Sequence, residues 1–305
     1  MPSALNAIIG NFDGVHAGHQ WVMRDAVETA RKLRAQAIAV TLEPHPTRLL
    51  RPERAPKLIT PLAEKLALLE QTGLDAVLVL PFTAEVAAWS AHEFGDRVLH
   101  RALRAVEVHE GENFRFGRDA SGNVHTLAEM GREMGFTVRV NTPLKVRGVA
   151  VSSSCIRELL QAGDVSRARP LLSRNFSITS TPAHGRGYGT RYAVPTINLA
   201  PYADLLPANG VYVTCMKVGD GTFESVTNIG NRPTFGADSF AVESHLLNFH
   251  PLDLDESTPL TLTFLKRLRE ERRWPTPEAL RAQIALDVSR AQRYFRLVQT
   301  LQAAN

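Results

Sequence analysis

The segment AIIGNFDGVHAGHQ, residues 7–20, decides the fold of the first half of the chain. A short apolar run ends at Ile9, and a loop that holds three glycines and two histidines follows at once. The run has the length of a buried strand, and the residues from Trp21 to Ala35 repeat apolar side chains with helical period. In α/β proteins, ligands bind beyond the carboxyl ends of the strands. The segment therefore predicts a strand, a ligand-binding loop and a helix in succession.

The same alternation continues to about residue 140. Strands are expected at residues 4–9, 37–42, 76–80, 105–109 and 137–140, with helices at 21–35, 62–69, 92–103 and 127–134. Strands that alternate with helices form a parallel sheet, and unbroken apolar strands indicate that both of its faces are covered. We therefore expect a Rossmann-like, doubly wound α/β domain.

The second half of the chain has a different pattern. Helices are expected at residues 152–163 and 164–172, and short alternating stretches follow at 176–179, 211–218, 223–228, 242–249 and 260–265. The dipeptide Asp220-Gly221 is a strong hairpin signal, so this pattern predicts a small antiparallel barrel. We place the domain boundary near Ser173, which gives domains 1–173 and 174–305.

A long helix is expected from Thr276 onward. Its apolar stripe consists of Leu280, Ile284, Val288, Ala291, Phe295 and Val298. We expect this stripe to pack against the barrel.

Composition narrows the class of protein. The 305 residues carry a net charge of +4, which suits anionic ligands such as nucleotides without indicating nucleic acid. Only residues 266–274 combine clustered basic side chains with an aromatic one, so we expect no nucleic-acid partner.

Two cysteines, Cys155 and Cys215, form no CxxC pair, and the N-terminus lacks the features of a signal peptide. The apolar runs are too short to span a bilayer, so we expect a cytoplasmic protein without a membrane partner. The sequence does not define an oligomeric state.

The loop after the first strand has the residues of a phosphate site. Gly10 and Gly14 allow a tight turn, Gly18 allows close approach of a ligand, and the next helix supplies its positive N-terminal end. His16 and His19 can donate hydrogen bonds to phosphate oxygens. A plain turn with two surface histidines is the alternative. A zinc site is less favoured because no third ligand is obvious nearby.

Four motifs occur in order in the first half: GNFDGVHAGHQ (10–20), TLEPHP (41–46), GENFRFG (111–117) and SSSCIR (152–157). Together they resemble the N-terminal module of bacterial bifunctional riboflavin kinase/FAD synthetases, which is similar to nucleotidylyltransferases with an HxGH phosphate site. The resemblance implies transfer of AMP from ATP to FMN, which gives FAD and pyrophosphate. By residue match it implies catalytic phosphate contacts for His16, His19 and Arg157, ATP or phosphate binding for Gly10, Asn11, Phe12, Asp13, Gly14, Gly18, Ser152, Ser153 and Ser154, and flavin binding for Asn113.

Residues 43–46, Glu-Pro-His-Pro, have two readings. They are either a rigid turn after the second strand or direct ligands, since each proline restricts the backbone in both cases.

In the second half, Thr196 and Asn198 lie two residues apart on an extended segment and therefore point the same way. Their neutral oxygens suit Mg²⁺ that is partly ligated by ATP phosphates. Glu243 stands in an otherwise apolar strand, either on a solvated face or as a general base. Gly185, Gly187 and Gly189 form a loop whose amides could surround phosphates.

The stretches HGRGYGTRYAVPTINL (184–199), GVYV (210–213), NIGNRPTF (228–235) and VESHLLNF (242–249) resemble the riboflavin kinase module of the same family. That module is a small Greek-key barrel with a trailing helix. The resemblance implies that Thr196 and Asn198 hold Mg²⁺–ATP, that the glycine loop covers the phosphates, and that Glu243 activates the ribityl 5′-hydroxyl. It places Arg269 beside the flavin and Trp274 at an aromatic position, where packing is the alternative role.

The resemblance implies two reactions in one chain, riboflavin to FMN and FMN to FAD, with ATP and Mg²⁺. Ser154, Thr190 and Ala193 depart from the family pattern. The last two leave open whether ATP affinity or the kinase rate is reduced, but Pro195, Thr196 and Asn198 are intact, so we expect kinase activity. An enzyme with an impaired kinase module, or a non-catalytic regulator that binds flavin or nucleotide, are the alternatives. His16, His19 and Glu243 favour catalysis.

Overall fold

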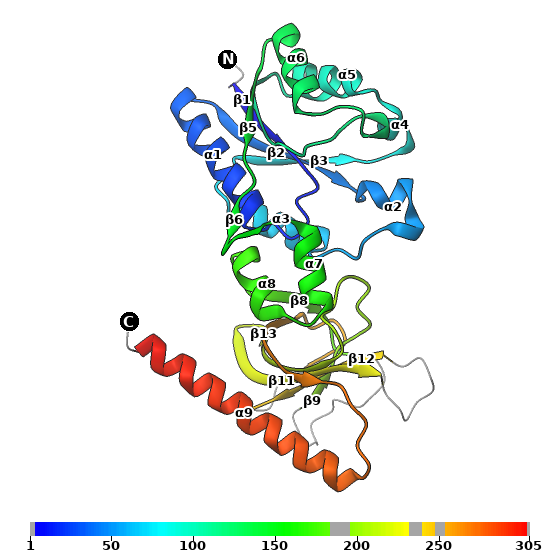
Figure 1. Ribbon diagram of the computed structural model, residues 1–305, viewed down its shortest axis with the longest axis vertical. Helices are drawn as coiled ribbons and strands as arrows, with labels where there is room; N and C mark the ends of the chain where they lie inside the picture. The colour runs from blue at the N-terminus through cyan, green and yellow to red at the C-terminus, as the bar shows by residue number, and fades with distance from the viewer. Residues whose placement is uncertain (1–3, 184–195, 232–239, 248–253, 304–305) are drawn as a thin grey trace. The chain divides into compact units, whose positions relative to one another are not determined.

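The computed structural model describes residues 4–183, 196–231, 240–247 and 254–303 (Figure 1). Contacts divide the chain into two compact units, residues 1–153 and 154–305. Helices α7 (Ser153–Gln161) and α8 (Val165–Leu172) are grouped almost entirely with the strands that follow them. The functional division near Ser173 stays a prediction.

Unit 1 is built on a five-stranded parallel sheet, as predicted. Its strands lie in the order β3-β2-β1-β4-β5, and all four neighbouring pairs are parallel. The strands are β1 (Leu5–Ile9), β2 (Gln36–Glu43), β3 (Ala76–Pro81), β4 (Ala105–Gly111) and β5 (Thr137–Asn141). The strand order reverses between β1 and β4, so the carboxyl ends of these two strands open the crevice in which such sheets bind ligands.

Helices cover both faces of this sheet (Figure 1). The longer ones are α1 (Ala17–Leu33), α3 (Leu62–Glu70) and α6 (Val124–Met134), and the shorter ones are α2 (Pro46–Leu50), α4 (Ala84–Ala88) and α5 (Ala91–Phe94). One core joins Ile8 of β1 to Met23 of α1 and Leu69 of α3. A second core joins the other sheet face to α5 and α6. The doubly wound prediction is therefore confirmed.

Two helices of unit 1 differ from expectation. The helix expected from Trp21 begins at Ala17, because the His16 side chain caps it by accepting a hydrogen bond from the His19 amide. The helix expected at 92–103 is α5 followed by a π-helical segment, Gly95–Ala102. Short 3₁₀ turns at Pro52–Arg54 and Arg118–Ala120 and a small hairpin of β6 (Lys145–Val146) and β7 (Val149–Ala150) complete the unit.

Unit 2 is a curled antiparallel sheet with strand order β8-β13-β10-β11-β12-β9. The strands are β8 (Phe176–Ser180), β9 (Thr196–Asn198), β10 (Gly210–Val218), β11 (Gly221–Asn231), β12 (Phe240–Leu246) and β13 (Leu260–Glu270). Backbone hydrogen bonds from Ala183 to Asn198 and from Ala200 to Thr181, each 2.8 Å, join the two edges. The sheet therefore closes into the predicted barrel. The β10–β11 hairpin turns at Gly219 and Asp220, one residue earlier than the sequence signal.

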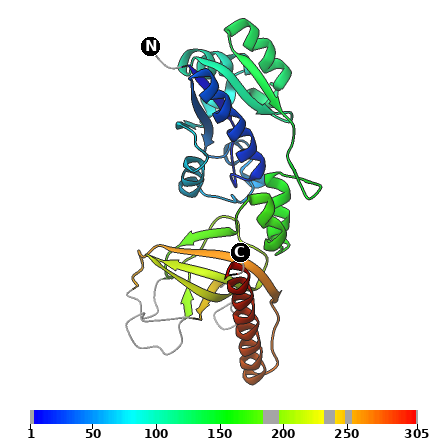
Figure 2. The same cartoon turned by 90° about the vertical axis from the view of Figure 1, so that its left-hand side faces the viewer.

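The long helix α9 (Pro277–Ala303) lies along the barrel (Figure 2). Ala291 and Phe295 pack against Val211, Val213 and Val226, as expected. The prediction that Leu280 and Ile284 belong to the buried stripe is wrong, since their side chains are 40% and 46% exposed. The first turns of α9 extend past the strands of the barrel (Figures 1 and 2), which agrees with the exposure of this part of the stripe.

Candidate active sites

The loop between β1 and α1 is fixed by the segment that precedes α3. The buried Asp13 carboxylate accepts hydrogen bonds from the amides of Ile59 (2.9 Å) and Thr60 (3.0 Å). The Thr60 hydroxyl accepts one from the Gly14 amide at 2.9 Å. The N-terminal capping position of α3 is Pro61, which makes no side-chain hydrogen bond to the helix. The Thr60 side chain therefore orders the loop instead of the helix.

Local sterics explain why glycine stands at three positions of this loop. Gly14 has a left-handed backbone with φ of +85°, and a Cβ at Gly10 would lie 2.8 Å from the Phe12 ring. A Cβ at Gly18 would approach the His16 ring to 3.2 Å. Each substitution would displace an aromatic ring or strain the backbone, so these glycines set the shape of the loop at the start of α1.

His16 and His19 form a stacked pair at the N-terminus of α1. Their ring centroids are 3.5 Å apart with an interplanar angle of 14°, and the Phe12 ring meets His19 edge-on. Burial, and secondarily His16, lowers the pKa of His19 well below its ordinary value, so His19 is neutral near pH 7. Because His16 Nδ1 accepts the His19 amide, the proton of a neutral His16 ring is assigned to Nε2. That N–H can donate to an anionic ligand.

Lys65 is a residue of this site that the motifs do not contain. Its buried Nζ donates to the Asn11 carbonyl (3.3 Å) and the Thr41 hydroxyl (3.1 Å), and lies 3.7 Å from a Glu43 carboxylate oxygen. Burial lowers the pKa of Lys65, while Glu43 opposes that shift. The helical period gives a signal for it, since Lys65 lies one turn before the fully buried Leu69.

Glu110 lies where the two central strands separate. The last β1–β4 pair is Ile8 with His109, and the next amide, that of Ile9, donates to Glu110 Oε1 at 2.8 Å. This carboxyl group is buried, and burial raises its pKa well above the ordinary value. The side chain therefore replaces a backbone partner at the switch point. Its location follows from strand pairing, which the sequence does not reveal.

The serine run, residues 152–154, contacts the β1–α1 loop through Ser153. The Ser153 hydroxyl donates to the Asp13 carbonyl at 2.9 Å, and Ser152 directly precedes α7. Ser154 and Arg157 follow on α7 and are grouped with unit 2. Their roles at the phosphate loop stay predictions.

Other polar residues stand at the carboxyl edge of the sheet. Asn113 follows the end of β4 at Gly111, across the switch point from the β1 loop. The buried Asn11 Oδ1 has no hydrogen-bond partner among the described residues. His45 Nδ1 accepts the Thr47 amide at 3.3 Å and caps α2, which favours the rigid-turn reading of residues 43–46.

The barrel brings three predicted residues onto one face. In the strand register, Asn198 of β9 is opposite Glu243 of β12, and Glu243 is opposite Asn228 of β11. Thr196 is opposite His245, and its hydroxyl lies 3.4 Å from His245 Nδ1. Directly opposed residues project to the same face. His245, whose pKa is lowered by burial, and Asn228 are neighbours to which no role was given from the sequence.

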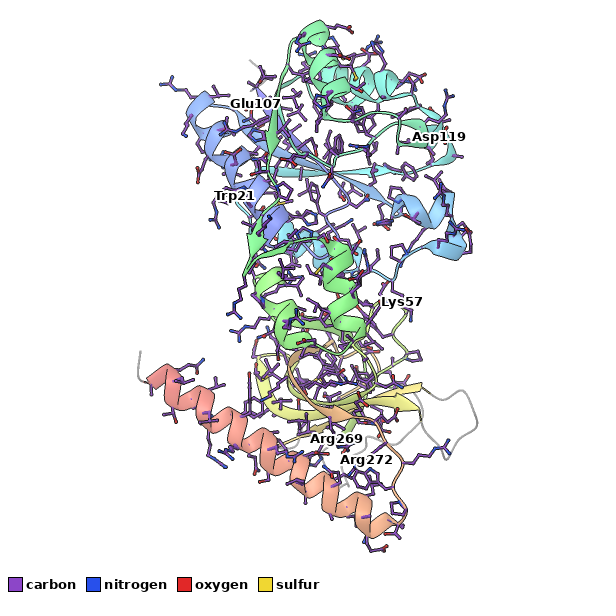
Figure 3. The ribbon with its side chains drawn as sticks, viewed as in Figure 1. Trp21, Lys57, Glu107, Asp119, Arg269 and Arg272 are labelled. Atoms are coloured by element: carbon purple, nitrogen blue, oxygen red, sulfur yellow. The ribbon has the colours of Figure 1, made fainter. Side chains whose placement is uncertain are left out.

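Arg269 lies on the same cross-strand row. It is paired with Val211, which is paired with Asn228, so the row leads to Glu243 across the sheet. The Arg269 guanidinium is bonded to Asp287 of α9 at 2.9 Å and lies 5.6 Å from the Trp274 ring centre. Arg272, labelled with Arg269 in Figure 3, lies over the same Trp274 ring, at 3.9 Å from its centre.

Part of the kinase prediction lies outside the described residues. This applies to Gly185, Gly187, Gly189, Thr190 and Ala193. The phosphate loop of the barrel therefore stays a prediction from sequence.

In the described part of the chain, no group of three or more His, Cys, Asp or Glu side chains could hold a metal ion. Both cysteines are free, and burial raises the pKa of Cys215 to about 11. Among the described helices, none is long and apolar enough to cross a membrane.

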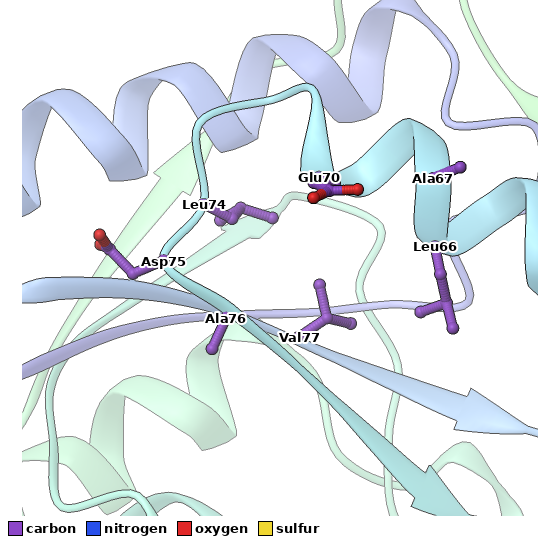
Figure 4. Close-up of a pocket in the computed structure, with 7 residues that line it drawn as sticks. All are labelled: Leu66, Ala67, Glu70, Leu74, Asp75, Ala76 and Val77. Carbon is purple, nitrogen blue, oxygen red and sulfur yellow. The ribbon is translucent and has the colours of Figure 1, made fainter.

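Unit 1 also has a depression whose lining contains none of the site residues named above (Figure 4). It is lined by Leu66, Ala67, Glu70, Leu74, Asp75, Ala76 and Val77. Its floor is the amino end of β3, whereas ligands of such sheets bind at the carboxyl ends. Asp75, one of its two acidic side chains, is already bonded to Arg31 at 2.8 Å. We therefore assign the site to the β1–α1 loop.

A parallel sheet with a glycine–histidine loop at its switch point, followed by a barrel with a polar Thr/Asn/Glu face, defines a two-domain, nucleotide-dependent transferase. Comparisons with known proteins agree. The family model described as FAD synthetase matches residues 2–155, and that described as riboflavin kinase matches residues 172–295. The chain belongs to the family of bifunctional riboflavin kinase/FMN adenylyltransferases.

Two relatives and one solved structure illustrate the similarity. The bifunctional riboflavin kinase/FMN adenylyltransferase of Pseudomonas fluorescens is 37% identical over 93% of this chain and 91% of its own length. That of Escherichia coli K12 is 33% identical over 95% and 93%. The crystal structure of a macrolide-efflux protein from Streptococcus pneumoniae has a TM-score of 0.84 and 25% identity, and covers 96% of this chain and 95% of that one.

Membership of the family confirms the general function expected from the motifs. Both catalytic domains are present, and the chain is an enzyme of flavin cofactor biosynthesis. ATP and riboflavin or FMN fit the family as its small-molecule substrates.

Proposed function

We propose that the chain makes FAD from riboflavin in two ATP-dependent steps at two separate sites. The barrel phosphorylates riboflavin to FMN, and the parallel-sheet unit transfers AMP from a second ATP to FMN. The single observation that best supports the proposal is the stacked His16–His19 pair, held at the start of α1 by its own cap. The cytoplasmic location stays a prediction.

The adenylyl transfer requires alignment and charge stabilisation rather than a protein nucleophile. The FMN phosphate attacks the α-phosphorus of ATP, the α–β phosphoanhydride bond breaks, and pyrophosphate leaves. We assign stabilisation of the leaving charge to the His16 Nε2–H and to the amides at the N-terminus of α1, which the His16 cap holds in place. Asp13, Thr60 and Lys65 hold the loop in shape before the substrate arrives.

The phosphorylation requires a base for the ribityl hydroxyl. Glu243 would accept that proton as the oxygen attacks the γ-phosphorus, and ADP leaves. Thr196 and Asn198 fit Mg²⁺, because they bring neutral oxygen-bearing side chains to the same face as this carboxylate. When bound with ATP, Mg²⁺ would neutralise phosphate charge.

Incubation with riboflavin, ATP and Mg²⁺, followed by chromatography of the flavins, tests the proposal. FAD is the expected product. FAD from supplied FMN, with no FMN from riboflavin, would indicate an impaired kinase module. Flavin that is bound but not converted would indicate a non-catalytic regulator.

A further inference from the structure

Asp287 is a buried acid on the face of α9 that meets the barrel. Its side chain is 2% exposed, and it lies one turn before Ala291 and two before Phe295, which pack against β10 and β11. The apolar stripe predicted for this helix did not include it. An acid at such a position requires partners for both carboxylate oxygens.

Both oxygens of Asp287 have directional partners. Oδ2 accepts from Arg269 Nε at 2.9 Å, and Oδ1 accepts from Gln283 Nε2, one turn earlier on α9, at 2.8 Å. Gln283 therefore fixes the carboxylate, and the carboxylate fixes the guanidinium. The side chain of Arg269 is only 18% exposed, so its freedom is limited on the other sides as well.

The way Asp287 binds Arg269 leaves part of the guanidinium for a ligand. Nε is used by Asp287 and Nη1 donates to the Glu270 carbonyl at 3.0 Å, while Nη2 has no hydrogen-bond partner among the described residues. The Trp274 ring lies 5.6 Å from the Arg269 guanidinium, and the Arg272 guanidinium lies over the same ring at 3.9 Å, so the ring stands among the donors of two arginines. Planar donors beside an aromatic ring suit a flat heterocycle with acceptor oxygens.

The position of Arg269 fits one end of the proposed flavin. Arg269, Val211, Asn228 and Glu243 are successive cross-strand neighbours on the side of the sheet that α9 covers. Three strand spacings separate Arg269 from Glu243, which is about 14 Å along the sheet. A tricyclic ring with a five-carbon side chain has that length. Ala291 and Phe295 cover Val211, so such a molecule would reach from Arg269 to Glu243 beside Val211 and not across it.

We propose that Asp287 positions Arg269 for the binding of riboflavin. In this proposal the Asp287 carboxylate holds the guanidinium so that its Nη2 edge faces the flavin ring. The proposal rests on the proposed kinase function and adds a role for the C-terminal helix. Asp287 does not touch the reacting atoms. Its loss should therefore affect riboflavin binding more than the chemical step.

Asp287→Asn tests the proposal, since it keeps the shape of the side chain and removes the charge. We expect the KM for riboflavin to rise about tenfold, which corresponds to about 1.4 kcal/mol, with kcat changed less than threefold. The KM for ATP in the same reaction should not change. FAD formation from supplied FMN should also be unaffected, because that site lies in unit 1.

Gln299→Ala is the matched control. Gln299 also joins α9 to the barrel, through Glu224 at 3.3 Å, but does not contact Arg269. It should leave the KM for riboflavin unchanged. An equal rise in both variants would show that Asp287 only attaches the helix, and a rise in the KM for ATP instead would place Arg269 at the phosphates. Either result, or an unchanged KM for riboflavin in folded Asp287→Asn, would overturn the proposal.

A second variant keeps the proposal testable if Asp287→Asn does not fold. If Asp287→Asn lacks the thermal transition of the barrel, Gln283→Ala leaves the ion pair and frees only the carboxylate, and it should raise the KM for riboflavin two- to threefold. An unchanged KM in that variant would also overturn the proposal. If wild-type protein forms no FMN, the proposed function fails. Riboflavin binding by fluorescence quenching, in wild type and variants, then tests the role of Asp287 by itself.

Discussion

His16 and His19 have different duties although their rings are stacked. His16 uses Nδ1 to cap α1, whereas His19 Nδ1 is buried without a partner among the described residues, and the motif leads us to expect both rings at the phosphates. Removal of one donor to a developing charge costs about 10²- to 10³-fold in rate. We therefore expect His19→Ala to slow FAD formation from FMN by about that factor. FMN formation from riboflavin, measured in the same preparation, should not change, and an unaltered FAD rate would remove His19 from the mechanism.

Glu243→Gln should have the opposite effect. The amide keeps the shape of the side chain at its place between Asn198 and Asn228 but cannot accept a proton. Loss of a general base costs about 10²- to 10⁴-fold. FMN formation should fall by that factor, while FAD formation from FMN continues. Loss of both activities would contradict the assignment of separate sites.

Glu110 gives a prediction about stability and pH. Its pKa is raised by burial, so the folded protein binds this proton more tightly than the unfolded chain does. The stability due to Glu110 is therefore complete below the unfolded pKa of about 4.3 and is lost as pH rises through the folded pKa. Glu110→Gln keeps an acceptor for the Ile9 amide and carries no charge. We expect its melting temperature to exceed that of wild type at pH 8, by about 2–4 °C for each 1 kcal/mol, and the difference to vanish near pH 4. A gap that widens toward acid pH would refute this reading.

At the scale of elements, α3 orders the loop between β1 and α1 through Lys65. Lys65→Met would leave the Asn11 carbonyl without this donor and Glu43 without a nearby cation. A buried polar group that loses its partner costs about 1–3 kcal/mol. We expect unit 1 to lose about that much stability and FAD formation to slow at least tenfold, while the kinase reaction stays unchanged. Lys32→Met, on the exposed last turn of α1, is the control and should alter neither.

The strands and most helices could be predicted because the spacing at which apolar residues recur is visible in the local sequence. The errors have local physical causes. A histidine caps α1 where a serine or aspartate is the usual signal, and the start of α9 extends past the barrel that would have buried Leu280 and Ile284. The predicted Thr196, Asn198 and Glu243 share a face because strand alternation is also local.

The partners of the site residues could not be predicted in the same way. Lys65, Glu110 and Asp287 act on residues 54, 101 and 18 positions away, and these pairs exist only once the sheet order and the packing of α9 are set. Each of the three is an ionisable residue on a face of a helix or strand whose other side chains are mainly apolar. An ionisable residue at a position where the periodic pattern predicts an apolar one is the signal that a sequence offers for such residues.

At the scale of the whole molecule, the residues of each proposed site belong to one unit, apart from Ser154 and Arg157, whose roles at the phosphate loop stay predictions. We therefore expect an equimolar mixture of the His19→Ala and Glu243→Gln variants to convert riboflavin to FAD through FMN released into solution. Each variant alone should stop at, or before, FMN. Chromatography of the flavins over time measures both, and failure of the mixture with each half-reaction intact would mean that FMN does not leave the chain.

The closure of the barrel has a consequence for association. Ala183 donates to the Asn198 carbonyl and Ala200 donates to the Thr181 carbonyl, so the end of β9 at Asn198 has a hydrogen-bonded neighbour on the side opposite β12 as well. A strand edge that is already paired offers no template for strand addition by a second copy. The proposed metal-binding strand therefore offers less unpaired backbone to a second copy of the chain than an open edge would.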